Sequence, residues 1–244
     1  MGIFRLKRFT VRQDRCAMKV GTDAILLGAW AFGDVSVDSN RNVKSILDVG
    51  TGSGIVALMM AQRFPTAAVQ ALEIDEAAAR QAADNFRSSP WANRLRVDQA
   101  NFNRWIETHS DRRFELIVSN PPYFENSLRP PQAERRAARH ADLLTVSQLM
   151  TGAAERLEPH GSLCVIFPAS GRQTCIDRAA AAGLLLQEEC RVRPTPQHDV
   201  HRVLLRFGLH AVTDPAVREL SIEHQRHQYT EDYAALAGDF LLKL

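Results

Sequence analysis

The composition of this chain excludes several classes of protein. Its 244 residues are 45% hydrophobic and 24% charged, which is typical of one large α/β domain, with or without a small addition. No apolar run approaches the length of a membrane span, and residues 1–10 are basic without the apolar core of a secretory signal. The four cysteines and eight histidines show no metal-ligand spacing, so we expect reduced thiols, no metal and a cytoplasmic location.

Basic side chains are concentrated in two segments, although the formal net charge is only +2. Residues 1–19 hold six basic side chains against Asp14, and residues 129–140 hold four arginines against Glu134. Clusters of this kind can neutralise the phosphates of a nucleic acid, and solvated surface charge is the alternative for each of them. The residues that we predict to make such contacts are Arg8, Arg12, Arg129, Arg135, Arg136 and Arg139.

The first 31 residues precede the first strand of the predicted core. Residues 3–12 alternate between apolar and polar side chains, as in a short strand or one arm of a hairpin. Residues 24–31 form a short apolar helix, for which Thr22 or Asp23 would serve as the N-cap. A helix in this position could lie over a cofactor bound at the glycine-rich loop described next. Lys19, Thr22 and Asp23 would then touch the amino-acid end of that cofactor. Capping alone explains Thr22 and Asp23 about as well.

A strand, a glycine-rich loop and a helix follow one another at residues 45–64. The loop, residues 50–54, has glycines at alternate positions behind Asp48, whereas dinucleotide folds use G-x-G-x-x-G, which argues against a dehydrogenase. The pattern Asp-x-Gly-x-Gly-x-Gly resembles the cofactor loop of class I S-adenosylmethionine-dependent methyltransferases; a tight strand–helix turn is the alternative. The residues that we predict to line the cofactor pocket here are Asp48, Gly50, Thr51, Gly52 and Gly54.

A second strand is predicted at residues 69–73, and a helix follows at residues 76–87. A carboxylate at the end of the second strand can accept hydrogen bonds from both ribose hydroxyls of an adenosyl group. We choose Glu73 for this role, with Asp75 as the alternate because it begins the next helix.

A third strand, residues 95–97, leads into a polar segment. Methyltransferases of the class that the loop resembles usually carry an Asp here for the adenine amine of the cofactor. This chain offers Asn101, whose oxygen can accept that hydrogen bond, and Asp98 is the competing candidate. Phe102 would flank the adenine ring, or would belong to the core.

The sequence Asn-Pro-Pro-Tyr at residues 120–123 is where we place the chemistry. It follows an apolar strand, residues 114–118, which the two prolines cannot continue, so an amide and an aromatic ring stand at the carboxyl edge of the sheet. The Asn120 side chain, which also borders the cofactor, and the Pro121 carbonyl can accept hydrogen bonds from an adenine amine and localise its lone pair. Pro122 stiffens the turn and Tyr123 can stack on the base. A proline-rich turn without a catalytic role is the alternative.

The rest of the chain completes the predicted sheet. Residues 124–140 have no strand periodicity and are predicted to be a loop that acts as a lid or substrate clamp. The elements expected after it are a helix at 143–156, a strand at 161–168, a helix at 172–182, strands at 184–193 and 201–208, and a helix at 229–244. The predicted fold is therefore a Rossmann-like α/β sheet of seven strands, mostly parallel with one antiparallel strand, with helices on both faces.

Residues 9–30, 46–54, 119–123 and the ending Tyr229-Thr230-x-x-Tyr233-x-x-Leu236-x-x-Asp239-Phe240 resemble the bacterial tRNA1(Val) adenine-N6 methyltransferase family. The first and last stretches are specific to that family, and Asn101 departs from the Asp that is common there. The resemblance implies S-adenosylmethionine as cofactor, RNA as the partner of the basic clusters, and methylation of the adenine beside the anticodon of a valine tRNA. We expect a monomer with an N-terminal cap over the cofactor (residues 1–31) and one catalytic domain (residues 32–244).

Other activities share part of these signals. Protein-glutamine N5-methyltransferases also use Asn-Pro-Pro-Tyr, on an amide nitrogen, and N6-adenine methyltransferases that act on ribosomal RNA or DNA would carry the same motif. The basic clusters and the two family-specific ends argue against the glutamine enzyme. A module that binds the cofactor and RNA without turnover is the alternative from another class, and intact Asn120 and Tyr123 argue against it.

Overall fold

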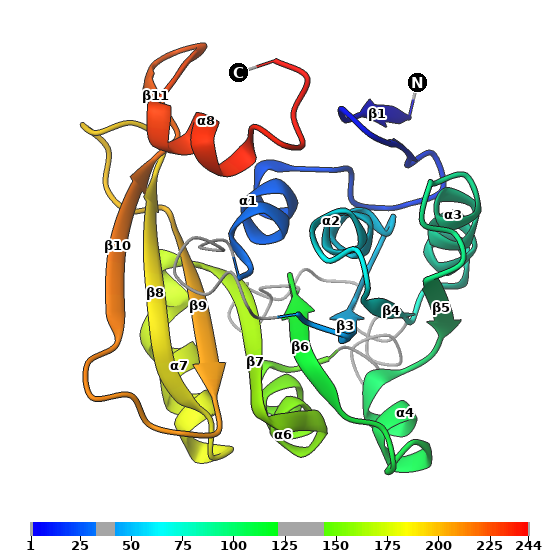
Figure 1. The fold of residues 1–244 in the computed structure, drawn as a ribbon. Helices are drawn as coiled ribbons and strands as arrows, with labels where there is room; N and C mark the ends of the chain where they lie inside the picture. Colours follow the sequence, from blue (N-terminus) through cyan, green and yellow to red (C-terminus); the bar gives the residue numbers. More distant parts are fainter. Residues whose placement is uncertain (1, 33–41, 122–143, 244) are drawn as a thin grey trace, which may run out of the picture.

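A computed structural model describes residues 2–32, 42–121 and 144–243 of the protein, which are organised around one eight-stranded sheet (Figure 1). The strands lie in the order β10-β8-β9-β7-β6-β3-β4-β5. Strand β9 runs antiparallel to its neighbours β7 and β8, and the other neighbouring pairs are parallel. The strands are β3 (Ser45–Val49), β4 (Ala68–Glu73), β5 (Leu95–Gln99), β6 (Phe114–Ser119), β7 (Leu157–Pro168), β8 (Leu185–Arg193), β9 (Arg202–Gly208) and β10 (Ala216–Ser221).

The predicted fold class is confirmed, including the single reversed strand, but the predicted number of strands is one too small. The additional strand is β10, which pairs in parallel with β8 at the edge of the sheet. Four of its six residues are exposed and only Leu220 is buried, so the segment has no hydrophobic periodicity that would predict a strand. The third predicted strand also extends two residues further, to Gln99.

The centre of the sheet is apolar on both faces. Every residue from Ile46 to Val49 in β3 and from Leu116 to Ser119 in β6 is buried. Helices cover both faces of a parallel sheet, so its inner strands form continuous hydrophobic runs rather than alternating ones. These two runs lie side by side in parallel register, with Val49 opposite Ser119, and therefore end at the same edge.

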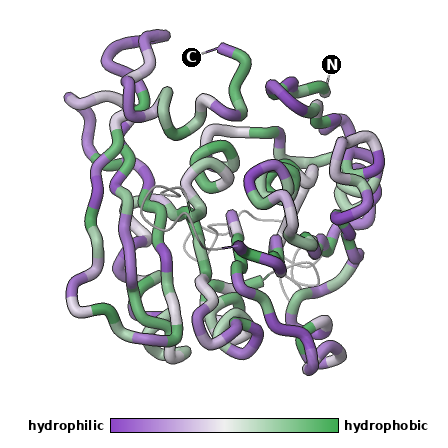
Figure 2. The backbone as a smooth tube through the Cα atoms, in the orientation of Figure 1, coloured by the Kyte–Doolittle hydropathy of each residue, from purple (hydrophilic) through white to green (hydrophobic). Residues whose placement is uncertain are grey.

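The helices form a layer on each face of the sheet (Figure 1). One apolar cluster contains buried residues of α1, α2, α3 and α8, and a second contains those of α4, α6 and α7. Figure 2 shows the hydrophobic stretches of the chain concentrated toward the middle of the molecule. The helices are α1 (Thr22–Trp30), α2 (Ile55–Arg63), α3 (Glu76–Arg87), α4 (Phe102–Thr108), α6 (Val146–Arg156), the 3-10 turn η2 (Ala169–Gly171), α7 (Arg172–Ala181) and α8 (Glu231–Ala237).

The starts of the helices follow capping side chains in most cases, and α1 is an exception. The side chain of Asp75 accepts a hydrogen bond from Ala78 N at 2.8 Å, and Thr145 forms a capping box with Gln148. The prediction that Thr22 or Asp23 caps α1 is wrong, because the N-cap is Gly21 and α1 begins at Thr22. Asp23 instead forms an ion pair with Arg202, as described below.

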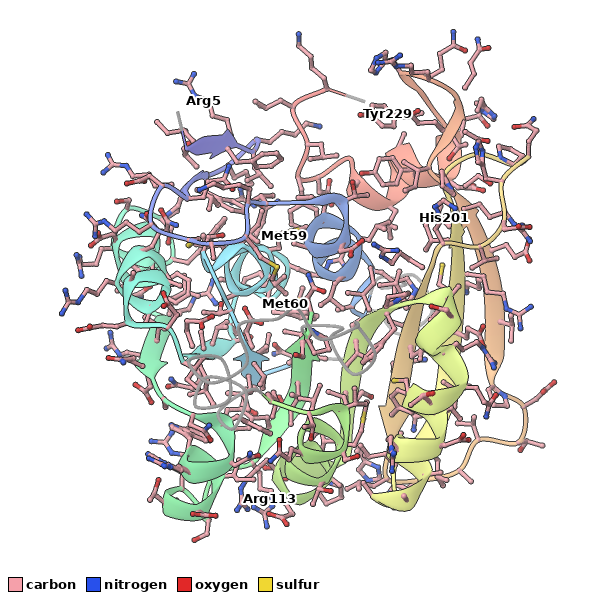
Figure 3. The ribbon with its side chains drawn as sticks, turned by 180° about the vertical axis from the view of Figure 1, so that it is seen from behind. Arg5, Met59, Met60, Arg113, His201 and Tyr229 are labelled. Atoms are coloured by element: carbon pink, nitrogen blue, oxygen red, sulfur yellow. The ribbon has the colours of Figure 1, made fainter. Side chains whose placement is uncertain are left out.

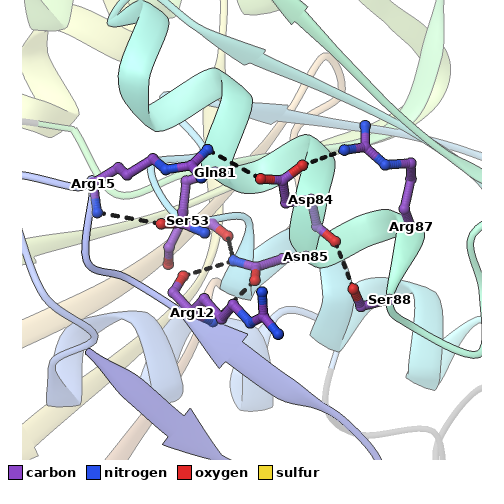
Figure 4. A network of polar contacts seen from close by, with 8 residues as sticks. All are labelled: Arg12, Arg15, Ser53, Gln81, Asp84, Asn85, Arg87 and Ser88. Atoms are coloured by element: carbon purple, nitrogen blue, oxygen red, sulfur yellow. Dashed lines mark hydrogen bonds and ion pairs between the residues drawn. The ribbon is translucent and has the colours of Figure 1, made fainter. Parts of the chain in front are cut away.

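A two-stranded hairpin, β1 (Ile3–Arg5) and β2 (Thr10–Arg12), precedes α1 and is fixed to α3 by buried polar contacts (Figure 4). The Asn85 amide accepts from Arg12 N at 2.9 Å and donates to the carbonyls of Arg12 and Ser53, each at 2.8 Å. Asn85 is 2% exposed, so these bonds replace its contacts with water. Because Ser53 belongs to the glycine-rich loop, one side chain joins the hairpin, α3 and that loop.

The C-terminal segment fastens the N-terminal hairpin to the helical layer. A small hairpin, β11 (Glu223–Gln225) and β12 (Gln228–Tyr229), leads into α8. Lys7 donates from its backbone to Phe240 O at 2.8 Å, and Gln62 donates to Asp239 O at 2.9 Å. The predicted helix over residues 229–244 is therefore too long: α8 ends at Ala237, and buried Phe240 anchors a non-helical ending.

Candidate active site

The glycine-rich loop between β3 and α2 takes its shape from three left-handed residues. Gly50, Gly52 and Gly54 have φ angles of 75°, 56° and 85°, a conformation that strongly favours glycine. A β-carbon at Gly54 would also lie 2.5 Å from a ring carbon of Phe86, whereas one at Gly50 or Gly52 would meet nothing within 4 Å. The alternate spacing in the sequence is therefore a backbone requirement, and the loop has open space beside two of its glycines.

Asp48 lies beneath this loop and holds it in place. Its Oδ2 accepts hydrogen bonds from Thr51 Oγ1 at 2.5 Å and from Ala57 N at 3.1 Å. Asp48 is 2% exposed, and this burial raises the pKa of its carboxyl to about 7. Thr51 is buried too, and its hydroxyl is turned toward Asp48. The structure thus gives both side chains a supporting position under the loop.

Glu73 stands at the end of β4, next to the loop. Its Oε2 accepts from Gly52 N at 2.8 Å and its Oε1 accepts from Asp75 N at 3.0 Å. Asp75, the alternate candidate, uses its own carboxylate to cap α3. Glu73 is partly exposed at the carboxyl edge of the sheet and is the better placed of the two for a ligand. Ile74 between them is 43% exposed, an apolar side chain that the sequence analysis did not single out.

The candidates near the end of β5 have other partners in the structure. Asn101 caps α4 through a hydrogen bond from Arg104 N at 3.3 Å. Asp98 accepts a hydrogen bond from Trp105 Nε1 at 3.0 Å. Each candidate therefore has a hydrogen-bond partner within the protein, and these contacts do not decide which of the two accepts from the adenine amine. Phe102 is 5% exposed and faces α6, since a β-carbon at Gly152 would lie 2.5 Å from its ring. This position favours the core alternative for Phe102.

Asn120 follows β6, which lies next to β3 at the point where the order of strands along the chain changes direction in the sheet. Val49 pairs with Ser119, and the Ser119 hydroxyl donates to Val49 O at 2.8 Å. The next residues in each strand, Gly50 and Asn120, therefore leave the sheet together at the carboxyl edge, where open α/β sheets bind ligands. Asn120 is half-buried and Pro121 is buried. The other two predicted catalytic residues, Pro122 and Tyr123, lie outside the described residues.

Asn120 and Pro121 line a cavity of about 610 Å³, which we call the Asn120 cavity. This volume lies within the range of small-molecule sites in proteins. The three N-terminal candidates of the sequence analysis, Lys19, Thr22 and Asp23, line the same cavity. The structure therefore brings together residues from the N-terminal segment and from the end of β6. Its complete described lining is Met18, Lys19, Gly21, Thr22, Asp23, Ala24, Leu26, Asn120, Pro121, Val192, Pro194, His201, Arg202 and Ile222.

The segment before α1 connects this cavity to Glu73. The Lys19 ammonium donates to the carbonyls of Gln13 and Cys16, at 2.5 Å and 3.1 Å. Burial is the main cause of the raised pKa of the Cys16 thiol, to which the negative charge of Glu73 also contributes. The segment thus carries Lys19 to the lining of the Asn120 cavity, and the charge of Glu73 contributes to the raised pKa of Cys16.

Sequence reasoning missed two residues of this cavity, His201 and Arg202. The Arg202 Nε donates to both carboxylate oxygens of Asp23, each at 3.0 Å. The two residues are 179 positions apart, and no local pattern links them. The only available signal was the charge of Arg202 at the start of a predicted strand.

The predicted RNA contacts are described only in part. The Arg8 guanidinium lies 5.7 Å from the centroid of the Trp91 ring, and Arg8 also lines a separate cavity of about 960 Å³ beside α8. The Arg12 side chain is exposed on β2. The other four, Arg129, Arg135, Arg136 and Arg139, lie outside the described residues, as does the whole of the predicted lid at 124–140. No group of His, Cys, Asp or Glu suited to a metal ion occurs within the part of the chain that the structure describes.

Known proteins resemble this chain in sequence over most of its length. Residues 35–177 match the family described as "Methyltransferase small domain". The tRNA1(Val) (adenine(37)-N6)-methyltransferase of Parabacteroides distasonis is 41% identical over 99% of this chain and 98% of its own length. That of Phocaeicola vulgatus is 43% identical over the same shares of both chains. The chain belongs to the tRNA1(Val) (adenine(37)-N6)-methyltransferase family.

A solved structure supports the fold of this family member. The crystal structure of a predicted O-methyltransferase from Agrobacterium tumefaciens has a TM-score of 0.68 and 20% identity, covering 91% of this chain and 99% of its own. At that identity the likeness concerns the fold alone. Among the described helices of the methyltransferase, none has the length and hydropathy that crossing a membrane requires.

Proposed function

We propose that the protein transfers a methyl group from S-adenosylmethionine to the exocyclic N6 of an adenine in the anticodon loop of a tRNA, adenine 37 of tRNA1(Val). The observation that carries this proposal is the position of Asn120 beside the glycine-rich loop, at the edge where β3 and β6 end together. The near-full-length similarity to enzymes named for that reaction supports the choice of substrate.

The residues at this edge fit S-adenosylmethionine. The open side of Gly50 and Gly52 lets a ligand approach the backbone closely. Glu73 accepts one backbone N–H on each oxygen, and a carboxylate has about four acceptor positions, so it can also accept the ribose hydroxyls. When bound, the cofactor supplies an electrophilic methyl group on a sulfonium.

The remaining cofactor contacts are assigned by position. We assign Lys19 and Thr22 to the amino-acid end, because both line the cavity that Asn120 borders. Asp48, Thr51 and Gly54 shape the loop from below, and Asn101 or Asp98 accepts from the adenine amine. Residues 1–31 then act as the cap, and hydrogen bonds from Asn85 hold the hairpin against the loop.

The side chains of the protein orient the base and its amine. An exocyclic amine is a poor nucleophile because its lone pair is delocalised into the ring. The Asn120 oxygen and the Pro121 carbonyl accept the two amine hydrogens, which favours a pyramidal nitrogen with a localised lone pair. Stacking on Tyr123 would hold the flipped base, as in other enzymes that act on single bases. No strong general base is needed, since the proton leaves after methyl transfer.

The basic segments provide the RNA contacts in this proposal. Arg8, Arg12 and the arginines of residues 129–139 would neutralise phosphates of the anticodon stem and loop. In this proposal the enzyme meets its tRNA in the cytoplasm and acts as a monomer.

The experiment that tests this function uses the purified protein with radiolabelled S-adenosylmethionine. Separate pools of tRNA, ribosomes, DNA and peptide-release factors are incubated with it, and label is expected in N6-methyladenosine of tRNA alone. Label in a glutamine of a release factor, in ribosomal RNA or in DNA would replace the proposed substrate. If the protein binds the cofactor but no pool is labelled, the protein would be a non-catalytic module that binds cofactor and RNA.

The variant Asn120→Ala tests the chemistry. Loss of the amide removes one acceptor for the amine, so turnover should fall by at least about a hundredfold. Calorimetry should show S-adenosylmethionine binding nearly unchanged, because the glycine-rich loop and Glu73 remain. Full activity in the variant would end the assignment of Asn120 as a catalytic residue.

A further inference from the structure

The Asn120 cavity extends well beyond the end of β6. Strand β7 lies between β6 and β9, and Pro168 at the end of β7 pairs with Arg202 at the start of β9. Because β9 is reversed, its first residues stand at the same edge as the ends of the parallel strands. His201 and Arg202 thus form a wall of the cavity that is two strands away from Asn120.

This wall is fixed by backbone and side-chain contacts. His201 donates its N–H to Val192 O at 2.9 Å and accepts from Ala169 N at 3.1 Å through its carbonyl. Arg202 donates to Asp23 from Nε and to the His201 carbonyl from Nη1 at 3.1 Å. Figure 3 shows His201 at the edge of the sheet, with its side chain exposed and far from Arg113 at the opposite edge.

The charges around the Asn120 cavity favour an anion. Its described lining holds two cations, Lys19 and Arg202, against one carboxylate, Asp23, which is paired with Arg202. Lys19 is bonded to neutral carbonyls, so those contacts leave its positive charge in place. The cofactor's amino-acid end, assigned above to Lys19 and Thr22, occupies one side of the cavity, and His201 and Arg202 lie on the wall that neither this end nor the uncharged base is assigned to.

We propose that His201 and Arg202 hold the phosphodiester that joins the target adenosine to its neighbour, so that the cavity receives a whole nucleotide. This inference rests on the proposed function. Arginine suits phosphate because its donors form a rigid fork, and a histidine ring can donate to phosphate or stack on a neighbouring base. Contacts to phosphate position a nucleic acid without reading its sequence. The pair would therefore set how deeply the nucleotide enters and would align its amine with Asn120.

The test is a double-mutant cycle in which one change is made in the enzyme and the other in the RNA substrate. An anticodon stem-loop RNA is prepared with its normal linkages, and in two further forms with one neutral methylphosphonate, either 5′ or 3′ of the target adenosine. The value of kcat/KM is measured for the parent enzyme and for His201→Ala and Arg202→Gln. On the normal RNA each variant should lose roughly tenfold, and one of the two neutral linkages should cost the parent a similar factor.

The decisive result is the combination of the two changes. If His201 and Arg202 contact that phosphate, the variants should lose little more on the neutral-linkage RNA, and their KM should rise more than their kcat falls. If the loss from the enzyme variant and the loss from the neutral linkage multiply for both the 5′ and the 3′ linkage, the proposal is overturned. Thermal unfolding and calorimetric cofactor binding establish that each variant is folded. If Arg202→Gln unfolds because it breaks the pair with Asp23, then His201→Ala still decides the outcome.

His198→Ala is the matched control. It removes the same kind of side chain from the same turn, three residues away. The His198 ring lies edge-on to that of His201, with 6.3 Å between the ring centroids, but His198 is not among the described residues that line the cavity. Its kcat/KM should stay within about twofold of the parent. A loss equal to that of His201→Ala would mean that the turn as a whole matters, and would overturn the assignment. Failure of the proposed function looks different, since the parent would then methylate no form of the RNA.

Discussion

The backbone N–H of Gly52 donates to Oε2 of Glu73 at 2.8 Å, so the glycine-rich loop after β3 and the carboxylate at the end of β4 form one unit. The same carboxylate accepts from Asp75 N on its other oxygen. Glu73 is thereby held in one orientation by two backbone N–H groups before any ligand arrives. Such preorganisation lowers the cost of ordering a site on binding.

Replacing Glu73 should weaken cofactor binding in proportion to the acceptors removed. Glu73→Gln keeps the shape and one acceptor oxygen, and its Kd for S-adenosylmethionine should rise about tenfold; Glu73→Ala should raise it about a hundredfold. Calorimetry measures both values. Asp75→Asn is the matched control, because asparagine also caps a helix and the Kd should barely change. A larger effect at Asp75 than at Glu73 would assign the ribose contact to Asp75.

Features of the site that depend on neighbouring residues were predictable from the sequence. The glycine spacing behind Asp48 reflects φ angles that local geometry demands, so it is visible within seven letters. Asn120 could be placed because an apolar strand ends in prolines, and parallel strands present their ends at one edge. These signals predicted where strands β3 to β7 lie along the chain and where the candidate chemistry is placed.

Contacts between distant segments were not predictable in the same way. The pair of Asp23 with Arg202 spans 179 residues, and it took Asp23 away from the capping role that its position in the sequence suggested. Strand β10 is mostly exposed, so its pairing with β8 leaves no apolar pattern. In each case, contacts between elements that are remote in the sequence decided the outcome.

Burial of Asp48 should make the free energy of unfolding depend on pH. Its pKa is about 7 in the folded protein against an ordinary value of 3.8, so between these values the folded state binds more protons than the unfolded state. Stability from this group is then full below about pH 4 and is lost as pH rises through 7. The total loss should be on the order of a few kcal/mol.

Asp48→Asn isolates this contribution. The asparagine oxygen can still accept from Thr51 or Ala57, and the side chain does not ionise. Urea unfolding between pH 4.5 and 8 should show that the parent loses more stability than the variant over this range, with the difference growing as pH rises. Parallel pH profiles for the two proteins would show that Asp48 does not titrate there.

Thr230 joins the C-terminal helix to the sheet. Its Oγ1 caps α8 by accepting from Tyr233 N at 3.1 Å and donates to Ser221 O at 2.5 Å beside β10. Thr230 is buried, so Thr230→Ala should cost about 1 to 2 kcal/mol of unfolding free energy, measured by urea denaturation. Thr213→Ala, at an exposed position, should stay within about 0.5 kcal/mol. Equal effects at both positions would contradict a capping role.

Charge reversal at Arg135, Arg136 and Arg139 tests the second basic segment, which lies outside the described residues. If these side chains neutralise phosphates, changing all three to Glu should weaken tRNA binding and lower the slope of log K against log salt by about 2 to 3. Fluorescence anisotropy at several salt concentrations gives both quantities. If the slope of log K against log salt equals the parent's, this segment makes no phosphate contact with the tRNA.

The control for that triple variant must change the net charge by the same amount elsewhere. Lys44, Arg112 and Arg113 are exposed and precede β3 and β6, so they lie at the amino edge of the sheet, away from Asn120. Figure 3 shows Arg113 at that opposite edge. Their reversal to Glu alters the long-range field equally but removes no predicted phosphate contact, so binding should weaken less and the salt slope should stay near the parent's. Equal slopes in the two triple variants would mean that overall charge, rather than a docking surface, governs tRNA affinity.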